Sequence, residues 1–92
     1  MRELKWYIFN DSNEPLCWEY IKWDSARAIE FDCAEDADDF IILMQTYYPD
    51  FKEPMIPQET ILFYDGGYVS AEEVIGLMIE EIENNLREKQ NV

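Results

Sequence analysis

The sequence contains no histidine and only two cysteines, Cys17 and Cys33, among its 92 residues. Without an imidazole there is no Ser-His or Cys-His nucleophilic pair, and the common nitrogen ligand of metal sites is missing as well. The two cysteines form no C-x-x-C pair, and zinc would need more sulfur or histidine ligands than this. We therefore predict a protein that is not an enzyme, that holds no cofactor or metal, and whose cysteines are reduced thiols rather than a disulfide.

Basic residues are scarce too. Seven Lys and Arg stand against 21 Asp and Glu, which gives a formal net charge of −14. Repulsion at that level destabilises the compact state, and solubility alone needs a net charge of only about 2–8 in a small domain. DNA, RNA and anionic membranes are therefore poor direct partners, and a basic protein surface is the natural complement.

Long apolar runs are absent. The longest one, residues 40–44, is far shorter than the roughly 20 residues that a membrane-spanning helix needs. Met1-Arg2-Glu3 and the short amphipathic run that follows lack the pattern of a signal peptide. These features predict a cytoplasmic protein.

What is present is enough apolar material for a core: 48% of the residues are hydrophobic and 15% aromatic. We expect one α+β domain over residues 1–92. β-branched and aromatic residues predict five strands, at residues 4–9, 16–23, 28–31, 60–64 and 68–69, with a helical turn as the alternative for residues 16–23. Helices are predicted over residues 34–48 and from residue 71 onward. The order β-β-β-α-β-β-α predicts a small antiparallel sheet with two helices packed on it.

Two connections are predicted from turn-forming residues. Residues 49–58 hold three of the four prolines and show no periodicity, which indicates an ordered, extended loop. Asp65-Gly66-Gly67 supplies the positive φ of a tight turn and predicts a hairpin between the fourth and fifth strands.

Both predicted helices begin with a capping pattern. Asp32, with Glu35 three residues later, is a variant of the capping box, and Ser70 with Glu73 is a standard one. Apolar residues at helical spacing then predict a buried stripe on each helix. In the first helix Ile42 and Leu43 lie off that stripe, which indicates burial on more than one side. In the second helix the stripe consists of Ala71, Val74, Ile75, Met78, Ile79, Ile82 and Leu86.

Acidic residues are concentrated in two places. Four of the five residues 35–39 are acids, over roughly 6–7 Å of helix axis, which approaches the roughly 1.7 Å per charge of duplex DNA. Spread evenly, the net charge would average only one per ~400 Å² of surface, against one per ~110 Å² on a duplex. Mimicry of a nucleic acid therefore needs local concentration. The candidate partner-binding acids are Glu30, Asp32, Glu35, Asp36, Asp38 and Asp39 at the first helix, and Glu72, Glu73, Glu80, Glu81 and Glu83 on the outer face of the second.

A short, histidine-free, strongly acidic α+β chain with these acids resembles the small phage-encoded anti-defence proteins, of the anti-CRISPR and anti-restriction type, several of which are DNA mimics. The likeness extends over the whole chain in size and charge. It implies an inhibitor that acts in the bacterial host cell. Such an inhibitor would bind the basic nucleic-acid-binding surface of a defence nuclease or CRISPR effector as a DNA or RNA mimic.

Two other functions fit the same residues. The chain could be a non-enzymatic adaptor that binds a partner protein through residues 47–57, with the acids as solvated surface. It could instead hold calcium or magnesium through carboxylates near Asp36 and Asp39, although the glycine of a calcium loop is absent there. Mimicry predicts binding that collapses with salt, an adaptor predicts salt-tolerant binding, and a metal site predicts melting that depends on the ion.

Overall fold

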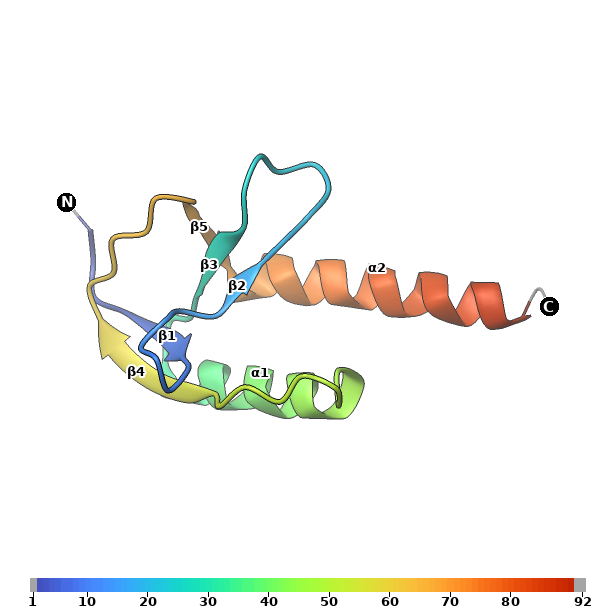
Figure 1. The fold of residues 1–92 in the computed structure, drawn as a ribbon, viewed down its shortest axis with the longest axis horizontal. Helices are drawn as coiled ribbons and strands as arrows, with labels where there is room; N and C mark the ends of the chain where they lie inside the picture. The colour runs from blue at the N-terminus through green and yellow to red at the C-terminus, as the bar shows by residue number, and fades with distance from the viewer. Residues whose placement is uncertain (1, 91–92) are drawn as a thin grey trace.

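The computed structural model describes the backbone of residues 2–90 and the side chains of residues 2–86. Five short strands and two helices follow one another in the predicted order, and the α+β class is confirmed (Figure 1). The elements are β1 (Lys5–Phe9), β2 (Cys17–Trp18), β3 (Arg27–Glu30), α1 (Ala34–Tyr47), β4 (Ile56–Thr60), β5 (Tyr68–Ser70) and α2 (Ala71–Gln90).

The strands form two small sheets instead of a single antiparallel one. β1 pairs with β4 in antiparallel fashion, and the second sheet has the order β2-β3-β5. In the second sheet β3 and β5 are parallel, with Glu30 opposite Ser70. A pair of backbone hydrogen bonds between Trp6 and Phe31, each of 2.9 Å, joins the two sheets. The expected hairpin between the fourth and fifth strands is therefore wrong, because β4 and β5 belong to different sheets.

The fourth strand lies earlier in the chain than predicted. Residues 56–60 pair with β1, so that Phe9 faces Ile56 and Lys5 faces Thr60. Pro57 is tolerated because a two-stranded sheet has only edge strands. The end of the predicted 49–58 loop is thus strand, and residues 61–64 are not. The Tyr68 hydroxyl holds that segment out of a strand, since it accepts a hydrogen bond from the Tyr64 N–H (2.7 Å) and donates one to the Leu62 carbonyl (2.9 Å).

The second strand is much shorter than predicted. Only Cys17 and Trp18 pair with β3, and a turn follows in which the Trp23 N–H donates to the Tyr20 carbonyl (2.9 Å). Ile21 at this turn is 95% exposed. Neither a strand over residues 16–23 nor a helical turn in its place is correct, because the chain leaves the sheet after Trp18.

The two glycines after Asp65 have different roles in the turn at residues 65–67. Gly67 has φ +92°, a conformation that favours glycine. At Gly66 a Cβ would lie 2.3 Å from the Ala26 carbonyl oxygen, and that carbonyl belongs to the loop between β2 and β3. Gly66 is therefore needed for close approach to this loop, and neither glycine makes a hairpin.

The predicted cap is wrong for α1 and correct for α2. The N-cap position of α1 is Cys33, which makes no side-chain capping hydrogen bond. Asp32 instead accepts a hydrogen bond of 2.8 Å from Lys5 on β1, because the pairing of Trp6 with Phe31 brings these two side chains together. At α2 the Glu73 N–H donates to the Ser70 hydroxyl (3.2 Å), as the capping box predicts.

The core lies between the sheets and the two helices. Phe40 and Met44 of α1 and Val74 and Met78 of α2 are buried together with Ile8, Ile29 and Phe31. Phe40 packs edge-on against Phe31, with ring centroids 5.4 Å apart. Off the stripe, Leu43 is half-buried but Ile42 is 60% exposed, so the expected burial of α1 around Ile42 is wrong.

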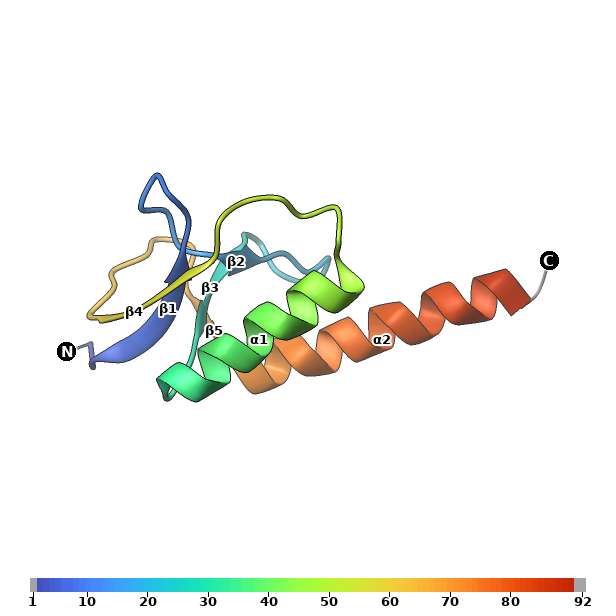
Figure 2. The ribbon, with the colours of Figure 1, turned by 90° about the horizontal axis from the view of Figure 1, so that it is seen from below.

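The molecule is longer than a compact domain of its size. The radius of gyration is 14.0 Å, against about 12.3 Å expected for 92 residues. The two helices run side by side in the same direction, and α2 continues well past the end of α1 (Figures 1 and 2). Neither helix, within the described residues, is both long enough and apolar enough to span a bilayer.

Candidate functional site

The parallel pairing of β3 with β5 brings the starts of both helices to one edge of the second sheet. β5 runs directly into α2, and β3 reaches α1 through three residues. Strands that run in the same direction end at the same edge of a sheet, so the helices that follow them begin there together (Figure 2). The first turns of these helices contain Glu35 and Asp36 in α1, and Glu72 and Glu73 in α2.

This acidic edge, which we define as Glu35, Asp36, Asp38, Asp39, Glu72 and Glu73, is exposed at every position. Neither of the two ion pairs found among the described residues includes any of these six. Two helix N-termini at one edge carry partial positive charge, which offsets part of the repulsion between the carboxylates. The arrangement is therefore tolerated by the fold and leaves its negative charge available to a partner.

Two of the predicted partner-binding acids, Glu30 and Asp32, form ion pairs with basic residues of the chain itself. Glu30 forms an ion pair with Arg2 and accepts a hydrogen bond of 2.7 Å from the Tyr7 hydroxyl. Burial, together with this hydrogen bond to a carboxylate, raises the pKa of Tyr7 to about 12. The Arg2 guanidinium also lies over the Tyr68 ring, 3.4 Å from its centroid. Glu30 thus ties β1, β3 and β5 together near the N-terminus.

Asp32 is only partly engaged. Its carboxylate pairs with Lys5, and this hydrogen bond raises the pKa of the lysine. The Asp32 side chain nevertheless remains 82% exposed. An exposed pair of this kind is worth about 0–1 kcal/mol, so Asp32 could exchange Lys5 for a cation of a partner.

The acids farther along α2 do not form one surface. Glu80, Glu81 and Glu83 are all exposed, but they border different hollows. Glu80 and Glu81 face the loop between β2 and β3, in a hollow that Trp18 and Ile21 also line. Glu83 lies beside Ile79 and Ile82, on the side of α2 that faces α1. The predicted outer face of the second helix is therefore divided.

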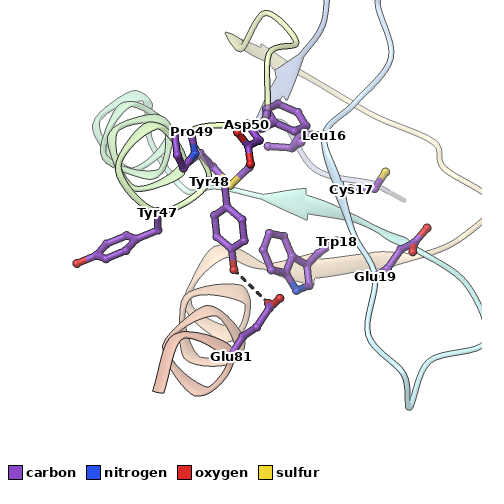
Figure 3. Close-up of a pocket in the computed structure, with 11 residues that line it drawn as sticks. Leu16, Cys17, Trp18, Glu19, Tyr47, Tyr48, Pro49, Asp50 and Glu81 are labelled. Atoms are coloured by element: carbon purple, nitrogen blue, oxygen red, sulfur yellow. Dashed lines mark hydrogen bonds between the residues drawn. The ribbon is translucent and has the colours of Figure 1, made fainter. Parts of the chain in front are cut away.

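A cleft of about 580 Å³ lies between β2, the end of α1 and α2 (Figure 3). Trp18 and Tyr48 meet edge-to-face in it, with ring centroids 5.8 Å apart. The Tyr48 hydroxyl donates to a Glu81 carboxylate oxygen at 3.1 Å. Burial, and then this hydrogen bond, raise the pKa of Tyr48 to about 12. Asp50 adds one more carboxylate to the cleft, whereas Glu19 lies at its border with the side chain directed away from Tyr48 (Figure 3).

Aromatic faces beside carboxylates attract cationic side chains, since the ring quadrupole and the negative charge act in the same direction. The cleft is therefore suited to a lysine or arginine of a partner. It is poorly suited to nucleophilic chemistry, because burial raises the pKa of the Cys17 thiol and so disfavours the thiolate. Over the described residues, no three His, Cys, Asp or Glu side chains are placed to share a metal ion.

The sequence indicated part of this cleft. The segment 47–57, a possible adaptor surface from the sequence, contributes exposed Tyr47 and Pro49 and half-buried Tyr48 to the cleft. Trp18 is partly buried against the core and forms one wall of the cleft. Trp23 is only partly exposed and lies outside the cleft, where the Arg27 guanidinium is 4.5 Å from the centroid of the Trp23 ring. The cleft as a whole could not be predicted, because it joins segments that are far apart in the chain.

Comparisons of the chain with models of protein families, with curated proteins and with solved structures returned no match.

Proposed function

We propose that this protein binds the basic nucleic-acid-binding surface of a bacterial defence nuclease or CRISPR effector, and inhibits it as a mimic of DNA or RNA. The observation that carries the proposal is the acidic edge. Its six exposed carboxylates lie in the first two turns of α1 and the first turn of α2, and both helices begin at the same edge of the second sheet (Figure 2). Such a surface fits Lys and Arg side chains that otherwise hold phosphates.

Local concentration of charge is essential to the proposal. The surface of 6637 Å² carries a net charge of −14, or one charge per about 470 Å². Duplex DNA has about one charge per 110 Å², so the average surface is too dilute by a factor of about four. The acidic edge is denser than the average, because four of its acids occupy residues 35–39 of one helix. It would attract a basic groove at long range and give fast association.

The test is competition with a labelled duplex for a panel of purified CRISPR effector and restriction nucleases. For a nuclease that the protein inhibits, one variant carries Glu35→Gln, Asp36→Asn, Asp38→Asn and Asp39→Asn. We expect its affinity to fall by at least ten-fold, because losing one side of a charge pair that is desolvated on binding costs about 2–5 kcal/mol. Wild-type affinity should also fall steeply between about 50 and 200 mM salt.

A matched control removes the same charge elsewhere, from four exposed acids outside the acidic edge. It carries the substitutions Asp11→Asn, Glu14→Gln, Glu53→Gln and Glu59→Gln. Affinity should fall much less in this control than in the first variant. Equal losses would mean that only net charge matters.

A third variant, with Glu80, Glu81 and Glu83 changed to Gln, tests the second helix. Loss in this variant alone would move the binding surface to α2, and no loss in any of the three would refute mimicry.

The cleft between Trp18 and Tyr48 favours a second candidate function, that of a protein–protein adaptor. Aromatic residues are enriched at the energetic centres of such interfaces, and this cleft adjoins the 47–57 segment. An adaptor of this kind should retain its partner at high salt, and Trp18→Ala should weaken binding more than neutralisation of the acidic edge does. Pull-down at low and high salt with both variants separates the two functions.

A further inference from the structure

The acidic edge leads into an apolar groove between α1 and α2 that the fold leaves open. The groove has a volume of about 300 Å³, and only one of the residues that line it is charged, Glu83. Its apolar walls are Leu43, Tyr47, Ile75, Met78, Ile79 and Ile82. The groove lies on the side of α2 where the apolar stripe continues toward the C-terminus.

Several of these apolar side chains are left in water by the chain itself. Tyr47 and Ile79 are each 51% exposed, and Leu86, one turn beyond Ile82, is 54% exposed. α1 ends at Tyr47 while α2 continues beyond it, so no helix or strand of the described residues covers that part of the stripe (Figure 1). The exposed surface of 6637 Å² also exceeds the roughly 5,600 Å² expected for this mass. The groove therefore has apolar area to bury against a partner.

The charges around the groove determine the kind of partner. Residues three, four or seven apart lie on the same face of a helix. Asp39 and Asp36 therefore continue the row of Leu43 on α1, and Glu72 continues the row of Ile75 on α2. Glu83 follows Ile79 by four residues and flanks the groove on the other side. An apolar partner with positively charged flanks is complementary to this surface.

A second copy of this chain is a poor occupant. Its own apolar stripe is flanked by the same acids, and each copy carries a net charge of −14. Juxtaposing the two faces would place like charges opposite one another, which costs several kcal/mol. A basic partner avoids this repulsion and neutralises the flanking carboxylates.

We propose that this groove binds an amphipathic helix of the partner, with an apolar stripe at i, i+3 or i+4, and i+7 and with Lys or Arg on both flanks. Helices recognised in grooves use this spacing. Ile75 and Ile82 are seven residues apart, or about 10 Å along α2, so about two turns of the partner helix would contact them. The inference goes beyond the proposed function, because the sign of the partner's charge follows from the acids that flank the groove itself.

The experiment uses the full chain and three labelled synthetic peptides in a fluorescence anisotropy titration. One peptide has leucines at the helical spacing and lysines on the flanks, the second has the leucines scrambled, and the third has glutamates in place of the lysines. We expect the first to bind, and the scrambled and acidic peptides each to bind at least ten-fold more weakly. Equal binding of the first peptide and the scrambled peptide would refute the groove as a helix-binding site, because charge alone would then explain the affinity.

A matched pair of variants locates the binding. Ile79→Ser should weaken binding of the first peptide about ten-fold, because it removes apolar area from the groove. Ile61→Ser is the control, since Ile61 is equally exposed (48%) but lies in the connection between β4 and β5. Circular dichroism checks that both variants fold. Equal effects of the two substitutions would overturn the proposal. So would a wild-type dimer in sedimentation that Ile79→Ser converts to a monomer, since a second copy would then occupy the groove.

The two proposals can fail separately. Peptide binding that depends on Ile79, with no nuclease inhibited by the protein, would leave the groove as a site for some other basic helix. The opposite outcome has two parts. Inhibition of a nuclease would be lost with the acidic edge but unaffected by Ile79→Ser, and the scrambled peptide would bind as well as the first. This outcome would support mimicry and refute the groove as a binding site.

Discussion

The two helices have similar sequences in outline but different surroundings. Each begins with acids and carries an apolar stripe, yet α1 packs against β1 and β4 whereas α2 contacts β3 and β5. α2 has 20 residues and is therefore about 30 Å long, while β3 and β5 have four and three residues and reach only about 10–13 Å. The sheet can cover only the first part of α2. An apolar stripe therefore predicts what a helix could bury, and the size of the sheet decides how much of the stripe is buried.

The largest effect that separates the two helices should come from their apolar residues. Phe40→Ala removes a fully buried ring from α1, and we expect it to lower the free energy of unfolding by about 3–5 kcal/mol. Leu86→Ala on α2 should change it by less than about 0.5 kcal/mol, because the side chain is already half-exposed. Urea denaturation followed by tryptophan fluorescence measures both. A large loss with Leu86→Ala would show that the end of α2 is covered in solution.

A smaller effect is expected near the N-terminus, where Glu30 joins β3 to β1. The hydroxyl of Tyr7 is buried and bonded to a carboxylate, so Tyr7→Phe should cost about 1.5–3 kcal/mol. Because folding raises the pKa of Tyr7 from about 10 to about 12, its contribution is fully present below pH 10 and is lost as the pH rises to 12. Denaturation across this range should give a smaller decline for Tyr7→Phe than for the wild type. An unchanged decline would mean that other groups dominate.

The caps should show the smallest effects, and of opposite sign. Ser70→Ala removes the hydroxyl that accepts from Glu73 N–H at the start of α2 and should lower the free energy of unfolding by about 1 kcal/mol. Cys33→Ser should raise it by about 0.5–1 kcal/mol, because Cys33 is exposed, extended and without a capping hydrogen bond at the start of α1. Thermal melting at matched salt measures both. A Cys33→Ser variant that is less stable than the wild type would argue that the thiol has a packing role.

Local patterns predicted the elements that depend on local chemistry. The order of strands and helices, the cap at Ser70 and the buried residues Phe40 and Val74 follow from periodicity and turn residues. The position of β4 could not be predicted in this way. Residues 61–64 have a higher β propensity than residues 56–60. The Tyr68 hydroxyl nevertheless forms hydrogen bonds with the backbone of residues 61–64, and residues 56–60 pair with β1 instead.

The candidate site, too, could be predicted only where it depends on local sequence. The acids at each helix start could be identified from the sequence, but their meeting at one edge depends on the parallel pairing of β3 with β5, for which the sequence has no local signal. Glu30 and Asp32 were grouped with these acids because they are close in sequence. Their partners Arg2 and Lys5 are 28 and 27 residues away in the chain. The apolar groove could not be predicted from the sequence, because the apolar stripe of each helix, taken alone, indicates only burial in the core. The groove becomes visible when both helices are placed side by side.

The parallel pair also bears on how the chain folds. Ala28 of β3 lies opposite Tyr68 of β5, so forty residues separate the two partners. Closing a loop of that length costs entropy before any contact compensates for it, and such long-range pairing slows folding relative to a helical bundle of the same size. On the ribosome, β3 has no neighbour on that side until β5 has left the exit tunnel. A nascent chain that stops before Tyr68 would therefore lack this strand pair, and we expect it to remain open to proteolysis until β5 has left the exit tunnel.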